Sequence, residues 1–131
     1  MLGIDTNILV RFLVRDNDIQ FEKARKLIKR EIAAGRRVFV SQLVLLETEW
    51  VLRSRYSLPK NLIIEAVSGL LEATDVRFED EPAIEEALFI WKDTTADFAD
   101  CLIGAQNRRL GCRATATFDA KASKLPGFIA A

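Results

Sequence analysis

The feature that most constrains the fold is the alternation, along the whole chain, of short apolar runs with longer segments whose apolar residues recur at helical spacing. The clearest run is Val38-Phe39-Val40, which predicts a strand buried on both faces. The segment before it, residues 21–34, keeps helical spacing until Gly35 ends it. Strands that alternate with helices of about 10 to 15 residues are typical of an α/β domain with a parallel sheet covered on both faces.

The same patterns assign the rest of the chain to short strands and amphipathic helices. The predicted strands are residues 1–4, 38–40, 75–78, 114–118 and 128–129, the last as an edge strand. The predicted helices are residues 8–14, 21–34, 42–53, 61–73, 82–92 and 97–111, with a short helix after Asp119. Asn17 or Asp18 is expected to cap the second helix, and Ser41 the third. No repeat, linker or low-complexity tract interrupts this order, so residues 1–131 are predicted to form a single domain.

The composition argues against several classes of protein. The chain has 131 residues, 19 Lys and Arg balance 19 Asp and Glu, and there is no His. Cys101 and Cys112 lack the spacing of a zinc site, so zinc sites, His-based triads and a disulfide scaffold are poorly supported. The N-terminus lacks the basic and apolar regions of a signal peptide, and no run of about 18 apolar residues is present. We therefore expect a cytoplasmic protein that does not contact a membrane.

Acidic side chains recur where predicted strands end and helices begin. Asp5 follows the first strand, Asp97 and Asp100 open a helix, and Asp119 follows the strand at 114–118. Each of them also suits a helix cap or a first turn, where a carboxylate satisfies free backbone N–H groups. Because open parallel sheets bind ligands at the carboxyl ends of their strands, we expect these residues to converge at one edge.

Glu47 differs from these acids because it interrupts an apolar stretch, LVLLETEWVL, in the predicted helix 42–53. Its neighbours three and four positions away are all apolar, which predicts that its carboxylate lies on a buried face. A buried carboxylate is costly unless a cation, a hydrogen-bond network or a metal ion accompanies it. The same spacing favours Glu47 over Glu49 only slightly, and Glu49 has no assigned role.

Carboxylates that converge must be neutralised. At about 4 Å, two of them repel by roughly 4 kcal/mol at an effective dielectric constant near 20. Protonation or a divalent cation relieves this repulsion, and oxygen ligands without His or Cys suit Mg²⁺ or Mn²⁺. A hard cation held by a few carboxylates activates water and neutralises the charge that grows on a phosphate. The acidic residues therefore indicate phosphoryl chemistry.

Four motifs occur in order between residues 2 and 128: LGIDTNILVRFL, VSQLVLLETEWVLRSRY, ADFADCLIGAQNRRLGC and ATATFDAKASKLPGF. With them the sequence resembles the PIN-domain ribonucleases, in particular the VapC-type toxins of toxin-antitoxin pairs. The resemblance implies a PIN-like three-layer α/β/α fold with a central, mostly parallel sheet of four or five strands. The family's acidic quartet falls on Asp5, Glu47, Asp100 and Asp119, with Asp97 as an additional acid. Asp5 and Asp100 match its principal metal ligands, and Asp119 is expected to join them.

The resemblance implies an endoribonuclease that uses Mg²⁺ or Mn²⁺ to cut RNA, with tRNA or other stable RNA as the expected substrate. Glu47 would bind a second ion, or position and deprotonate the attacking water. Thr6, Asn7 and Thr117 would orient a carboxylate or a metal-bound water. The basic residues that would hold flanking phosphates are Arg11, Arg15, Arg108 and Lys121, with Arg109 and Lys124 as further candidates.

The resemblance also implies two protein partners: a small VapB-like antitoxin that covers the active site, and a second copy of the chain in a homodimer. The residues expected at the dimer surface are Leu62, Ile63, Leu70, Leu71 and Trp50. The chain departs from the family pattern at Cys101 and Gly104, where Ala is more frequent. Because all these side chains are small, the packing is expected to survive.

Three other functions stay open at this point. A haloacid-dehalogenase-like phosphatase also begins with strand, Asp and helix, but it needs a second Asp where Asn7 stands. A receiver-like domain would bind Mg²⁺ only to accept a phosphoryl group, but it needs an acidic pair after the first strand. A PIN-like domain that has lost catalysis would act as an RNA-binding or scaffold module, which the intact acidic set disfavours.

Overall fold

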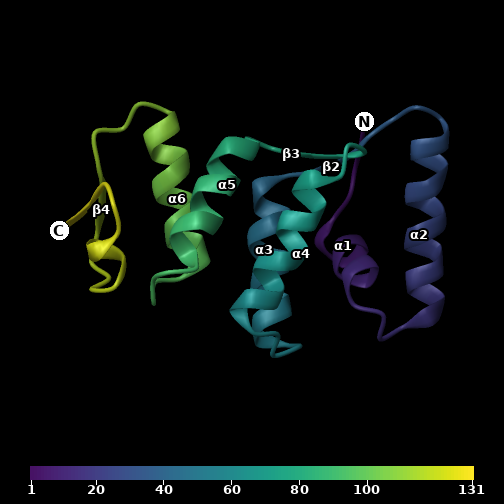
Figure 1. The fold of residues 1–131 in the computed structure, drawn as a ribbon, viewed down its shortest axis with the longest axis horizontal. Coiled ribbons are helices and arrows are strands. Elements are labelled where there is room, and N and C mark those ends of the chain that lie inside the picture. The colour runs from purple at the N-terminus through teal and green to yellow at the C-terminus, as the bar shows by residue number, and fades with distance from the viewer. The chain divides into compact units, whose positions relative to one another are not determined.

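The computed structural model describes residues 1–131 and contains two compact units, Met1–Glu79 and Asp80–Ala131 (Figure 1). All of its strands are parallel, and helices connect most of them. The predicted α/β class is therefore confirmed. Its strands form two hydrogen-bonded ladders, one in each unit.

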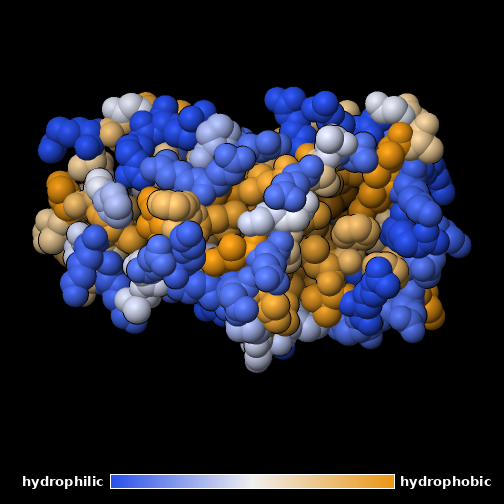
Figure 2. Space-filling model, viewed as in Figure 1, coloured by the Kyte–Doolittle hydropathy of each residue, from blue (hydrophilic) through white to orange (hydrophobic).

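The first unit contains a three-stranded parallel sheet in the order β1-β2-β3. The strands are β1 (Leu2–Gly3), β2 (Val38–Val40) and β3 (Val76–Phe78), and β2 pairs with both others. The helices are α1 (Thr6–Leu13), α2 (Asp18–Ala33), α3 (Gln42–Ser54) and α4 (Lys60–Glu72). α1 contacts both α2 and α3, and α3 lies beside α4 (Figure 1). The outer side of α2 is hydrophilic (Figure 2), as expected for an amphipathic helix.

Side-chain caps explain where the first three helices begin. The Asp5 carboxylate accepts a hydrogen bond from the Ile8 N–H, so α1 starts two residues earlier than predicted. Asn17 caps α2 through the Gln20 N–H, and Ser41 caps α3 through the Val44 N–H. Both caps confirm the predictions, which named Ser41 for α3 and either Asn17 or Asp18 for α2.

The hydrophobic core of the first unit explains why its strands are so apolar. Val38 and Val40 of β2 are fully buried, as are Leu45 of α3, Ile63 of α4 and Phe78 of β3. Burial of side chains of this size stabilises the fold by about 1.5–3 kcal/mol each. Because Ile63 belongs to this core, its predicted place on a dimer surface is wrong.

The second unit pairs two helices with a short parallel ladder. α5 (Glu81–Trp91) packs against α6 (Phe98–Arg109), with the Trp91 and Phe98 ring centroids 5.1 Å apart. β4 (Thr115–Thr117) pairs with β5 (Phe128–Ala130), and the 3₁₀ helix η1 (Ala122–Lys124) lies in the connection between them. An ion pair between Arg108 and Glu86 joins α6 to α5.

Gly104 allows α6 to approach β5 closely. A methyl group at this position would overlap the Phe128 ring and lie 3.0 Å from its Cζ. The ring occupies the space that the more frequent Ala would fill, so Gly104 and Phe128 form a matched pair. The packing therefore survives with Gly at this position, but because Phe128 fills the space and not because Gly and Ala are interchangeable here.

No helix of the chain is both long and apolar enough to cross a bilayer.

Gly104→Ala should lower the free energy of unfolding by about 1–3 kcal/mol, because the added methyl overpacks the contact with Phe128. Urea denaturation measures this change. The matched control is Gly69→Ala in α4, where an added methyl meets no atom within 4 Å; it should stabilise by roughly 0.5–1 kcal/mol. Phe128→Leu should recover part of the loss in Gly104→Ala, and equal effects of the two glycine substitutions would contradict the packing argument.

Candidate functional site

The first unit contributes two of the predicted acidic residues. Asp5 lies directly after β1, and its Oδ1 accepts the capping hydrogen bond from the Ile8 N–H at 3.0 Å. This bond uses one carboxylate oxygen and leaves Oδ2 available. Asp5 is exposed, so capping α1 does not prevent its carboxylate from binding a ligand as well.

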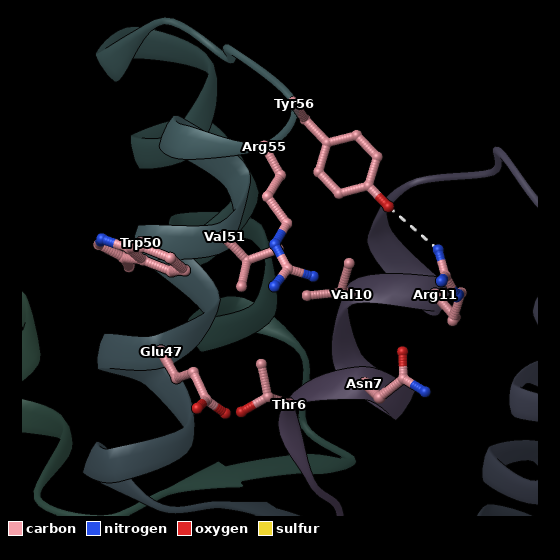
Figure 3. Close-up of a pocket in the computed structure, with 9 residues that line it drawn as sticks. All are labelled: Thr6, Asn7, Val10, Arg11, Glu47, Trp50, Val51, Arg55 and Tyr56. Carbon is pink, nitrogen blue, oxygen red and sulfur yellow. Dashed lines mark hydrogen bonds between the residues drawn. The ribbon is translucent and has the colours of Figure 1, made fainter.

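Glu47 lies in a pocket between α1 and α3, with a cavity volume of about 300 Å³. We refer to it as the α1–α3 pocket. Its lining residues from α1 are Thr6, Asn7, Val10 and Arg11, and those from α3 and the residues that follow are Glu47, Trp50, Val51, Arg55 and Tyr56. Figure 3 shows the Glu47 carboxylate directed towards the Thr6 hydroxyl at one end of the pocket. The structure thus brings together four of the predicted site residues: Thr6, Asn7, Arg11 and Glu47.

The prediction that Glu47 is buried is wrong. Glu47 is exposed, whereas Glu49 is 3% exposed and pairs with Arg53 at 2.8 Å. Apolar neighbours do not indicate a buried face here, because Leu43 and Trp50, one turn before and after Glu47, are themselves exposed. Glu49 is thereby assigned a structural role as the buried partner of Arg53.

The second unit contributes Asp97, Asp100 and Asp119. Asp97 occupies the N-cap position of α6 but makes no capping hydrogen bond, and Asp100 lies in the first turn of the same helix. Asp119 follows β4, and its Oδ1 accepts a hydrogen bond from the Ala122 N–H at 2.8 Å. Thr117 accepts a hydrogen bond from the Asp119 N–H at 3.0 Å, so its hydroxyl helps to fix the turn that carries Asp119.

Electrostatic repulsion links these three carboxylates. Partial burial raises the pKa of Asp100, and the negative charges of Asp119 and Asp97 raise it further. Asp97 and Asp119 also line one pocket of about 280 Å³, together with Lys121. None of the three acids forms an ion pair with Arg or Lys. These three acids of the second unit therefore influence one another, whereas the predicted convergence of Asp5 and Glu47 with them stays a prediction.

The donor set has the chemistry of a hard-cation site, since every candidate ligand is a carboxylate oxygen. A cation would also relieve the repulsion that raises the pKa of Asp100. Within neither unit do three acidic side chains lie close enough to share one ion. The residues of each unit therefore fit Mg²⁺ or Mn²⁺ by chemistry and charge, but not by the number of ligands.

The predicted phosphate-binding residues lie in different surroundings. Arg11 pairs with Asp16, and Arg108 pairs with Glu86 and donates to the Pro126 carbonyl. The Arg15 guanidinium stacks over the Phe21 ring at 4.2 Å. Of the four, Lys121 alone lies beside two of the acidic residues, in the pocket with Asp97 and Asp119.

Arg55 and Tyr56 are candidate site residues that were not predicted from the sequence. Both line the α1–α3 pocket, and Arg55 is eight positions after Glu47. Eight positions are slightly more than two turns of a helix, so the two side chains leave α3 on similar faces. The eight-residue spacing of Glu47 and Arg55 in ETEWVLRSRY is the sequence signal that could have identified Arg55.

The chain matches the model of the PIN domain over residues 3–127, and it therefore belongs to the PIN-domain family. The predicted resemblance to VapC-type PIN-domain ribonucleases is thus confirmed. Among curated proteins the chain is similar to a VapC ribonuclease of Aquifex aeolicus (strain VF5), with 25% identity over 122 residues. That match covers 93% of this chain and 90% of the relative. Among solved structures the chain is similar to VapC20 of Mycobacterium tuberculosis, a sarcin-ricin-loop-cleaving toxin, with 21% identity, a TM-score of 0.44, and coverage of 94% and 93% of the two chains.

Asp100→Asn should raise the melting temperature at pH 7 in the presence of EDTA. Because the pKa of Asp100 is raised in the folded state, its stabilising contribution is complete below the unfolded pKa of about 3.9 and is lost as the pH rises through the folded pKa. The advantage of the variant should therefore disappear near pH 3. Differential scanning calorimetry at both pH values measures this. Asp93→Asn, at an exposed site, is the control; an Asp100→Asn advantage that is equal at both pH values would contradict the repulsion.

Proposed function

We propose that this chain is an RNA-cleaving nuclease of the VapC type, the toxin of a toxin-antitoxin pair, and that it depends on a divalent cation. The observation that carries the proposal is the grouping of Asp97, Asp100 and Asp119 at the start of α6 and after β4 in a PIN-domain chain, where burial and the neighbouring charges raise the pKa of Asp100. Carboxylates kept close together without a basic partner are typical of functional sites rather than of structural ion pairs. The name of the Aquifex relative supports ribonuclease activity.

The five acidic residues have distinct roles in this proposal. Asp5, Asp100 and Asp119 would hold Mg²⁺ or Mn²⁺, with Asp97 as an additional acid. Bound to them, the cation would supply charge neutralisation at the scissile phosphate and lower the pKa of a water molecule. Glu47 would accept the proton of the attacking water or contribute to a second ion. Thr6, Asn7 and Thr117 would orient these groups.

The substrate and partners follow from the same proposal. We expect single-stranded or loop regions of tRNA or another stable RNA as the substrate, a small VapB-like antitoxin as the inhibitor, and action in the cytoplasm. Residues 1–131 would work as a single nuclease domain. A homodimer would use exposed or half-buried apolar residues; with Ile63 buried in the core and Trp50 lining the α1–α3 pocket, these are Leu62, Leu70 and Leu71.

Asp5→Asn and Asp100→Asn should each reduce RNA cleavage by at least about 100-fold, because each removes a carboxylate assigned to the cation. A gel assay on single-stranded RNA with Mg²⁺ measures the rate, and EDTA should abolish the wild-type activity. Asp75→Asn and Asp93→Asn, at exposed acids outside the site, should stay within about 3-fold of the wild type. Full activity of either site variant would refute the assigned roles, and RNA that is bound but never cut would indicate a non-catalytic PIN domain.

Cation binding has a readout that does not depend on activity. Millimolar Mg²⁺ should raise the melting temperature of the wild type, because a ligand that binds only the folded state stabilises it. The same addition should leave Asp100→Asn unchanged. An equal increase for both proteins would show that Asp100 is not a ligand.

A further inference from the structure

We propose that the α1–α3 pocket binds one nucleotide of the RNA substrate, with a phosphate on Arg55 and the base against Trp50. This inference rests on the proposed function, because it assigns a subsite beside one of the acidic residues of that function. The pocket contains Glu47 at one end and Tyr56 at the other (Figure 3). An RNA strand bound in the pocket would therefore extend from Glu47, the proposed proton acceptor, towards Tyr56.

Arg55 is the guanidinium in this pocket that no carboxylate neutralises. It caps the C-terminus of α3, and its side chain extends back along the helix, so that the guanidinium lies between Val51 and Val10 (Figure 3). Glu47 is the only acidic residue that lines the pocket, and it forms no ion pair with Arg55. A guanidinium held over a polar cavity without a carboxylate is suited to bind a phosphate in two-point contact.

The other arginine of the pocket has a different task. Arg11 donates hydrogen bonds to Tyr56 at 3.0 Å and to Asp16 at 3.1 Å, and the Tyr56 hydroxyl donates to Asp16 at 2.9 Å. Its charge is therefore already used inside the protein. The three side chains join α1 to the segment after α3 and fix the Tyr56 end of the pocket before any ligand binds. Such preorganisation lowers the entropic cost of binding.

Size and lining favour a nucleotide. The cavity of about 300 Å³ lies at the lower end of the range for small-ligand sites, which suits one nucleotide rather than a folded element. Trp50 lines the pocket and is 51% exposed, so part of its indole is accessible to a base. Stacking on an aromatic ring is tolerant of sequence and is characteristic of proteins that hold single strands. Thr6 and Asn7 add hydrogen-bonding groups at the Glu47 end.

The Arg55 contact is tested by steady-state cleavage of a single-stranded RNA by the wild type and three variants. Arg55→Ala should raise KM about 10-fold while kcat changes by less than about 3-fold, because the lost contact is made equally in the ground state and the transition state. Arg55→Lys should recover part of the loss, since it keeps the charge but not the two-point contact. The matched control, Arg30→Ala on the exposed side of α2, should leave both constants unchanged.

Binding without cleavage is measured by fluorescence anisotropy in the Asp100→Asn background with EDTA. Arg55→Ala should reduce the slope of log affinity against log salt by about 0.7, the value for one phosphate contact on a single strand. Trp50→Ala should raise the Kd about 5- to 20-fold, and Trp50→Phe should stay within about 3-fold of the parent because it keeps an aromatic face. Melting temperatures near that of the parent show that the variants are folded.

Two results would overturn the inference. The first is an unchanged KM and salt slope in Arg55→Ala, which would leave the pocket to another ligand, such as an acidic segment of a protein partner. The second is a Trp50→Ala variant whose molar mass by light scattering is half that of the wild type while its RNA affinity is unchanged, which would assign Trp50 to a dimer surface. If the wild type cuts no RNA, the proposed function fails, but the anisotropy measurements still test the subsite by themselves.

Discussion

Repulsion among carboxylates that the fold holds near each other is the constraint on which the candidate site depends. In the second unit, α6 carries Asp97 and Asp100 in its N-terminal turn, and the segment after β4 carries Asp119. Partial burial and the charges of Asp119 and Asp97 raise the pKa of Asp100, and no basic side chain forms an ion pair with the three acids. A fold selected only for stability would separate or pair these groups. In this fold the three acids are neither separated nor paired with a basic residue. Their grouping therefore favours a bound cation and, in a PIN-domain chain, phosphodiester chemistry.

The caps at Asp5 and Asp119 show that a structural and a functional role are compatible in one carboxylate. Each uses Oδ1 to accept a backbone N–H three residues later, which fixes the direction of its side chain. Each retains a second oxygen. A carboxylate whose orientation the backbone already determines loses little entropy when it binds a ligand, so capping prepares these residues for coordination rather than competing with it.

Local sequence signals predicted the elements well, because caps and apolar spacing act within a few residues. β2 begins and ends at the predicted residues, and α3 begins where Ser41 caps it. The burial of Glu47 and Glu49 was not predicted correctly, since α3 carries apolar residues on its exposed face as well and periodicity alone does not show which face packs. The pocket around Arg55 depends on the long-range network of Arg11, Asp16 and Tyr56, which no local pattern encodes.

The short connection between β4 and β5 has a further consequence. Parallel strands usually need a crossover of about a dozen residues or more, often with a full α-helix. Here residues 118–127 are sufficient, because η1 compacts the path and contacts both strands. The connection has no spare residues, so an insertion or deletion in it would shift the register in which β4 and β5 pair. Unlike most surface loops, this one should therefore tolerate few changes in length.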